Sequence, residues 1–304
     1  MRRFFPPVLI AGLLAWSPAQ GQDFSQLFIF GDSLSDIGNI RAASLNTVPA
    51  SPPYFEGRFS NGPNYTDILA ERLGLGPLQP SLLLGTNYAW GGAWGGADTR
   101  QSILLIPSIL TQVGQFIATL EGTQADGEAL YIVLGGGNDV EGALDDGLDA
   151  DSGAERMSQA AQSLIQATQL LLDNGAMYLM VVDTPDLSTT PRHLDRSTAR
   201  DLSALVNQEL AQGLVDMPVI RLANATIHAA MEADFTISDA SCLGAGMIGE
   251  SCDNPDDFFY FDDFHPTTAG HAMLTGLVLQ ALEASMQTVA RETSWGQLKA
   301  ALHP

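Results

Sequence analysis

Basic residues are scarce in this chain of 304 residues, and lysine occurs only once, as Lys299. The 13 basic residues stand against 35 acidic ones, which gives a formal net charge of -22. Nucleic-acid binding depends on clustered lysine and arginine, and electrostatic attachment to anionic lipid headgroups requires the same cations. The composition therefore argues against both kinds of partner, although hydrophobic contact with a lipid stays open.

Long apolar runs are also missing. A transmembrane helix needs about 18 or more uncharged apolar residues in a row, and the sequence contains no such stretch. The N-terminus has the pattern of a secretory signal peptide: Arg2 and Arg3 precede an apolar stretch, Val8 to Trp16, and a small-residue cleavage site, Ser17-Pro18-Ala19. We expect residues 1–22 to be removed on export. The mature chain would then be secreted or periplasmic and would contain no integral membrane segment.

Cysteine occurs only as Cys242 and Cys252. In an exported protein this pair predicts a disulfide bond, and the alternative is two reduced, buried thiols. Motifs for metal or nucleotide binding are absent: the sequence has no H-E-x-x-H, no Cys-x-x-Cys and no P-loop, so we expect neither a metal site nor a cofactor. The acidic run from Asp139 to Asp151 does not match EF-hand spacing and is expected to form a solvated loop.

Short apolar runs alternate with helical patterns along the chain. This alternation predicts an α/β fold with a central parallel sheet, because parallel strands are joined by helical crossovers. No linker-like tract divides residues 23–304, so we expect a single domain. The predicted strands are Gln26–Phe30, Ala129–Leu134, Met177–Asp183 and Pro218–Leu222, and the predicted helices are Tyr65–Leu73, Ile109–Leu120, Ala154–Asp173 and Thr198–Leu214.

Two polar residues follow predicted strands closely. Ser33 comes just after the first strand, and Asn138 follows the strand that ends at Leu134. Ligands of open parallel sheets bind outside the carboxyl ends of the strands, so both side chains are expected at the same edge. This placement favours a role for Ser33 as a nucleophile over a role as a turn residue.

A serine nucleophile needs a base to accept its proton, and that base needs a group to orient it. His265 has the most suitable setting among the five histidines, because Asp262 precedes it by three residues and Pro266 follows it. A carboxylate at this spacing reaches one ring nitrogen and leaves the other free. The remaining histidines, which are expected to be surface or packed residues, are His193, His228, His271 and His303.

Two glycine-rich stretches could supply hydrogen-bond donors for an oxyanion. Gly91 and Gly92 allow a backbone N–H to approach a ligand closely, and Gly135 to Gly137 leave space beside the amide of Asn138. Each stretch taken alone is more typical of an ordinary turn.

The blocks GDSLSDIGN, NYAWGGA, GGND and DDFHP, in this order, resemble the four catalytic blocks of the GDSL esterase/lipase family, also called SGNH hydrolases. The resemblance implies a three-layer α/β/α, flavodoxin-like fold and a catalytic site without a cofactor. It assigns a nucleophile, a base with its orienting carboxylate, and three oxyanion donors. By position these are Ser33, His265 and Asp262, and the donors are the Ser33 N–H, the Gly92 N–H (with Gly91 as the alternative register) and the Asn138 side chain.

The segment Ser51–Pro63 is similar to the region that follows the first block in secreted bacterial lipases and lipid acyltransferases. Its aromatic residues Tyr54, Phe55 and Phe59 are candidates for lining an acyl pocket, and the alternative is a loop that packs onto the core. One departure is Ser188, where the family often has glycine, and it affects no catalytic role.

The sequence thus predicts a secreted serine esterase or lipase that hydrolyses small-molecule or lipid acyl esters. Three alternatives stay open: a phospholipid:alcohol acyltransferase with the same site, a carbohydrate acetylesterase, and a catalytically silent binding protein of the same fold.

Overall fold

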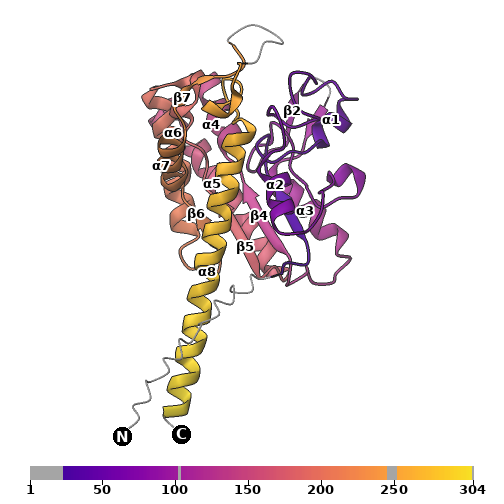
Figure 1. The fold of residues 1–304 in the computed structure, drawn as a ribbon, viewed down its shortest axis with the longest axis vertical. Coiled ribbons are helices and arrows are strands. Elements are labelled where there is room, and N and C mark those ends of the chain that lie inside the picture. The colour runs from indigo at the N-terminus through magenta and orange to yellow at the C-terminus, as the bar shows by residue number, and fades with distance from the viewer. Residues whose placement is uncertain (1–22, 102–103, 245–251, 303–304) are drawn as a thin grey trace, which may run out of the picture.

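The computed structural model describes residues 23–101, 104–244 and 252–302, so the expected signal peptide and His303 lie outside the described residues. Its centre is a parallel sheet of four strands in the order β1-β4-β5-β6, of which β4, β5 and β6 are labelled in Figure 1. All residues of β1 and β4 are buried, which explains their nearly continuous apolar sequences. The strands are β1 (Leu27–Phe30), β4 (Leu130–Leu134), β5 (Tyr178–Val182) and β6 (Ile220–Leu222).

An extended segment, residues 86–90, lies along the free side of β1. The N–H of Ile29 donates to the carbonyl of Thr86 at 3.1 Å, and the N–H of Tyr88 donates back to the carbonyl of Ile29 at 2.7 Å. With this segment counted as a fifth strand, the strand order is that of flavodoxin-like sheets. The chain reverses its direction of winding between β1 and β4, and ligands of such folds bind at this point.

Helices cover both faces of the sheet, so the fold is a three-layer α/β/α sandwich, as predicted. Alternate residues of each strand point to opposite faces. Phe28 and Phe30 pack in one core cluster with α3, α5 and α6, whereas Leu27 and Ile29 pack in a second cluster with α2 and α8. These helices are α2 (Tyr65–Arg72), α3 (Ile109–Thr119), α5 (Ala150–Asp173), α6 (Ser197–Gly213) and α8 (Thr268–Leu302).

The four predicted strands and four predicted helices are all confirmed, with ends that differ by up to four residues. No helix in the described ranges is both long and apolar enough to cross a membrane. The remaining elements are α1 (Asn39–Ala43), α4 (Gly137–Asp145), α7 (Asn224–Asp234), the antiparallel pair β2 (Thr99–Gln101) and β3 (Leu104–Ile106), the parallel pair β7 (Ile237–Ser241) and β8 (Phe258–Tyr260), and the 3-10 helices η1 (Ser81–Leu83), η2 (Leu187–Thr189), η3 (Pro191–His193) and η4 (Pro255–Asp257).

The prediction of a solvated loop from Asp139 to Asp151 is wrong for most of its length. The run begins within α4 and ends within α5. Val140, Ala143 and Leu144 recur at helical spacing and are buried, so their packing outweighs the acidic composition. Asp139 itself is only 4% exposed, and its carboxylate accepts the N–H of Gly95 at 2.9 Å.

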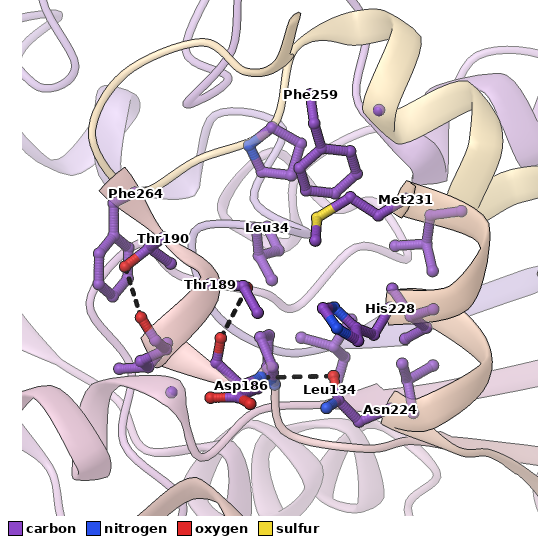
Figure 2. A pocket seen from close by; sticks show the side chains of 18 of the residues that line it. Leu34, Leu134, Asp186, Thr189, Thr190, Asn224, His228, Met231, Phe259 and Phe264 are labelled. Atoms are coloured by element: carbon purple, nitrogen blue, oxygen red, sulfur yellow. Dashed lines mark hydrogen bonds between the residues drawn. The ribbon is translucent and has the colours of Figure 1, made fainter. Parts of the chain in front are cut away.

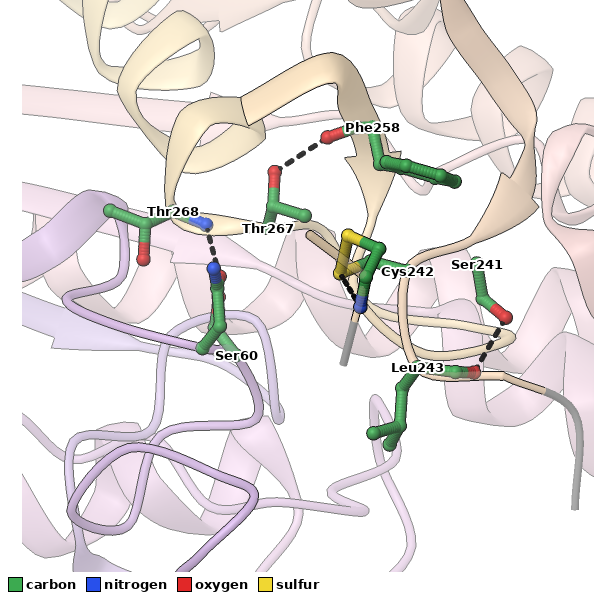
Figure 3. The surroundings of a disulfide bond; sticks show 9 residues. Ser60, Ser241, Cys242, Leu243, Phe258, Thr267 and Thr268 are labelled. Carbon is green, nitrogen blue, oxygen red and sulfur yellow. Dashed lines mark hydrogen bonds between the residues drawn. A yellow bond between two sulfur atoms is a disulfide. The ribbon is translucent and has the colours of Figure 1, made fainter. Parts of the chain in front are cut away.

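Cys242 and Cys252 form a disulfide bond beside the segment that leads to Asp262 (Figure 3). The backbone on the Cys242 side is paired with that segment, because Cys242 N–H donates to the carbonyl of Tyr260 and Leu243 N–H donates to that of Phe261. The covalent link therefore closes a loop whose base is part of the framework that carries Asp262 and His265.

A buried glutamine fixes the end of β1. The side-chain oxygen of Gln112, on α3, accepts the N–H of Gly31 at 2.9 Å, and its amide nitrogen donates to the carbonyl of Gly31 at the same distance. Gln112 is completely buried. This two-way contact holds the backbone just before Asp32 and Ser33.

Replacing this side chain should destabilise the protein. Gln112→Ala leaves the buried Gly31 N–H without a partner, so we expect the free energy of unfolding to fall by about 2–3 kcal/mol. Urea denaturation measures the change, and Gln115→Ala, an exposed glutamine on the same helix, is the matched control. Equal loss of stability in the two variants would contradict the role given to Gln112.

Candidate active site

Ser33 lies in the tight turn that leaves β1, at the carboxyl edge of the sheet. Ser33 is largely buried, with 8% of its surface exposed. The carbonyl of Asp32 accepts the N–H groups of Ser35 and Asp36, at 3.0 Å and 2.9 Å, which turns the chain sharply after the strand. The turn presents the Ser33 hydroxyl to the segment between β8 and α8.

Three side chains form a continuous line of hydrogen bonds. His265 Nε2 lies 2.8 Å from Ser33 Oγ, and His265 Nδ1 lies 2.8 Å from Asp262 Oδ2. The other carboxylate oxygen of Asp262 accepts the N–H groups of Phe264, at 2.8 Å, and His265. The structure thus brings together the three residues that the sequence singled out, in the order serine, histidine, carboxylate.

The charges around His265 favour a protonated ring. Burial alone would lower the pKa of His265, but the facing carboxylate of Asp262, with further help from Asp32 and Asp263, raises it above its ordinary value. Burial alone would raise the pKa of Asp262, yet the ring of His265 and the hydroxyl of Tyr54 hold it well below its usual range. Asp262 is therefore ionised at neutral pH.

The segment Ser51–Pro63 packs against this line of side chains. The hydroxyl of Tyr54 donates to Asp262 Oδ2 at 2.7 Å, and the ring of Phe59 lies 5.1 Å from that of His265, measured between centroids. Ser60 Oγ donates to the carbonyl of Pro266 at 2.9 Å. Phe55 instead lies under the guanidinium of Arg58 and lines no cavity together with Ser33.

Backbone contacts distinguish the two glycines that the sequence left open. The N–H of Gly91 donates to Asp36 Oδ2 at 2.8 Å, so it is already occupied. The N–H groups of Gly92 and Ser33 donate to no acceptor within the residues that the structure describes. Gly92 has a φ of 81°, a conformation that glycine adopts without strain.

The side chain of Asn138 lies beside the same loop. Its amide nitrogen donates one hydrogen to the carbonyl of Ala93 at 3.0 Å, which orients the amide. Asn138, Gly92 and Ser33 line one cavity together with His265. Of the two registers, the one with Gly92 leaves three donor groups, two backbone and one side-chain, around a common space.

Asp36 organises both halves of this arrangement. Burial raises the pKa of its carboxyl to about 6, against the opposing effect of the backbone N–H groups that it accepts. It therefore remains mostly ionised at neutral pH and binds the turn after β1 to the glycine loop. The donors are the N–H groups of Gly38, Asn39, Ile40 and Gly91, at 2.7 to 3.1 Å.

Two cavities meet at Ser33. The first, here called the outer cavity, is open to solvent and borders His265, Tyr54, Phe59 and the ion pair of Glu141 with Arg192. The second, here called the inner cavity, is more enclosed and largely apolar, and Figure 2 shows it from close by. Its wall includes Leu34, Leu134, Leu187, Met231, Phe259 and Phe264.

Residues 27–277 match the model of the GDSL-like lipase/acylhydrolase family. The chain belongs to this family. The match confirms the resemblance found in the four sequence blocks, and it includes all the residues that surround Ser33 in the structure.

Two relatives with named activities have about the same sequence identity to this chain. Lipase 1 of Photorhabdus luminescens is 31% identical over 66% of this chain, and the phosphatidylcholine-sterol acyltransferase of Aeromonas hydrophila is 30% identical over 73% of it. The chain spans 29% and 65% of the lengths of these two proteins. Among solved structures, an acetylxylan esterase of Geobacillus stearothermophilus is 14% identical with a TM-score of 0.49, over 86% of this chain and 95% of that one.

None of the other histidines within the described residues forms a hydrogen bond with Ser33 Oγ. His193 is buried and bonded through Nε2 to Glu141, and His271 is buried against the ring of Tyr65. Burial, with the nearby charge of His265, lowers the pKa of His271 to about 3, so that ring is neutral. His228 lies on α7, partly exposed, where its side chain borders the inner cavity.

Sequence reasoning missed the wall of the inner cavity. Its residues come from β4, α4, β5, η2, α7, β8 and α8 and from the loops that join them, so they are spread over most of the chain. No group of three histidine, cysteine, aspartate or glutamate side chains in the described ranges is arranged to hold a metal ion.

The pKa of His265 gives a direct test of the site's electrostatics. We expect the ring to titrate above the ordinary value of about 6.5, and the titration to move to lower pH in Asp262→Asn because the facing negative charge is lost. Histidine ring resonances in NMR spectra measure both titrations, with His265→Gln used to assign the signal. A wild-type value below the ordinary one, or no shift in the variant, would contradict this electrostatic picture.

Proposed function

We propose that this protein is a secreted serine ester hydrolase, in which Ser33 attacks the carbonyl carbon of an acyl ester. The observation that carries the proposal is the continuous set of hydrogen bonds from Ser33 through His265 to Asp262. Only the neutral imidazole accepts a proton, so His265 acts as the base when its Nδ1–H points at Asp262 and its Nε2 faces the serine hydroxyl.

The attack creates a negatively charged oxygen that needs preorganised donors. The N–H groups of Ser33 and Gly92 and the side-chain amide of Asn138 are the groups available for this oxyanion. His265 then gives its proton to the departing alcohol, which leaves the acyl group on Ser33. Water, activated by the same imidazole, releases the acid and restores the serine.

A second candidate is acyl transfer to an alcohol in place of water. The similarity to an acyltransferase supports it, and the outer cavity beside His265 is open enough to admit either acceptor. Product analysis with an ester and an added alcohol separates the two outcomes.

A silent binding role is less well supported, because each element of the proposed machinery is present. The N-terminal signal pattern and the disulfide support export.

Asn138→Ala tests the oxyanion site. Loss of one donor should reduce kcat by about 10²–10³ with little change in KM, because the interaction forms fully only in the transition state. Hydrolysis of a short-chain nitrophenyl ester measures this effect, and substitution of the exposed Asn254 by alanine is the control. Wild-type turnover by a folded Asn138→Ala variant would contradict the assigned role.

A further inference from the structure

The position of His265 distinguishes the two cavities that meet at Ser33. Ser33, Asn138 and Phe264 border both of them, but His265 borders only the outer cavity. The imidazole must give its proton to the departing alcohol oxygen, so the alcohol portion of the ester has to lie on the side of His265. The acyl portion then extends to the other side of the serine.

We propose that the inner cavity binds the acyl chain of the substrate and that Met231, which borders both this cavity and the next one, limits the length of chain that the enzyme accepts. This inference rests on the proposed ester hydrolysis and names its substrate class: esters whose acyl group is an apolar chain longer than acetyl.

The wall of the inner cavity suits an apolar chain because several of its polar groups are already paired. Thr190 Oγ1 donates to the carbonyl of Leu187 at 2.7 Å, and Thr189 Oγ1 donates to that of Asp186 at 2.8 Å (Figure 2). The carboxylate of Asp183 accepts hydrogen bonds from Nε and Nη2 of Arg221, each at 2.7 Å. With these groups paired among themselves, aliphatic and aromatic side chains supply most of the surface that faces the cavity.

Met231 stands at the boundary between this apolar space and a charged one. It projects from α7, is 5% exposed and packs with Phe259 (Figure 2). Beyond Met231 and His228 lies a third cavity, open to solvent, whose wall includes Asp195, Arg200, Glu232 and Asp239. Both residues border the inner and the third cavity, so the methionine side chain helps to separate them.

The size of residue 231 should therefore control chain-length preference. Met231→Ala removes the methionine's part of this barrier, which three other residues share, so a longer chain can extend into the third cavity. Met231→Phe instead shortens the inner cavity. For nitrophenyl dodecanoate over nitrophenyl butanoate, we expect the ratio of kcat/KM to rise by about 10-fold or more in Met231→Ala. The same ratio should fall in Met231→Phe.

Met157→Ala is the matched control, because it truncates a buried methionine on α5 that lines neither cavity at Ser33. Its ratio should stay at the wild-type value. Opposite shifts of this ratio in the two Met231 variants support the assignment. If the alanine variant does not fold, the ratio measured for Met231→Phe tests the assignment alone: a fall supports it, and an unchanged ratio contradicts it.

The same assays distinguish failure of the acyl-chain assignment from failure of the proposed ester hydrolysis. An active wild type whose ratio is unchanged by either Met231 substitution would overturn the acyl-chain assignment and leave ester hydrolysis standing. A folded wild type that hydrolyses neither ester would overturn the proposed function itself, and the assignment with it.

Discussion

The hydrogen bond between Ser33 Oγ and His265 Nε2 joins residues that are 232 positions apart in the sequence. It forms because the turn after β1 and the segment before α8 reach the same edge of the sheet. The His265 segment is held from several sides: Phe261 N–H donates to the carbonyl of His265, and Thr268 N–H donates to the side chain of Asn61. The segment Ser51–Pro63 thus acts as a brace that keeps the imidazole facing the serine.

Two buried carboxylates supply the order that this contact requires. An ionised carboxylate away from water is costly unless hydrogen bonds replace its hydration. Asp262 receives such bonds from His265, Phe264 and Tyr54, and Asp36 receives them from four backbone N–H groups. Each therefore fixes a segment of backbone: Asp262 orients the ring of His265, and Asp36 positions the glycine loop that carries Gly92. Groups fixed in this way need little reorganisation when charge develops on a substrate.

The sequence was sufficient to predict the sheet and the main helices, because buried parallel strands appear as apolar runs such as that of β4 and helices carry their own periodicity. It also indicated the grouping of Ser33, Asn138 and His265. It did not identify α4, since the acidic composition concealed the helical spacing of Val140, Ala143 and Leu144. The choice between Gly91 and Gly92 depends on a contact with Asp36, 55 positions away. The inner cavity, with Met231 between it and the third cavity, arises from side chains on several elements that are separated in the sequence. Such groupings cannot be read from one sequence.

The most direct test of the central contact is the rate at which a fluorophosphonate modifies Ser33, measured as a function of pH and located by peptide mass spectrometry. If His265 is the base for Ser33, the label maps to Ser33, its rate falls as pH drops through the pKa of His265, and His265→Ala is modified far more slowly at every pH. Labelling at another residue, or a rate for Ser33 that does not depend on pH or on His265, would contradict this account.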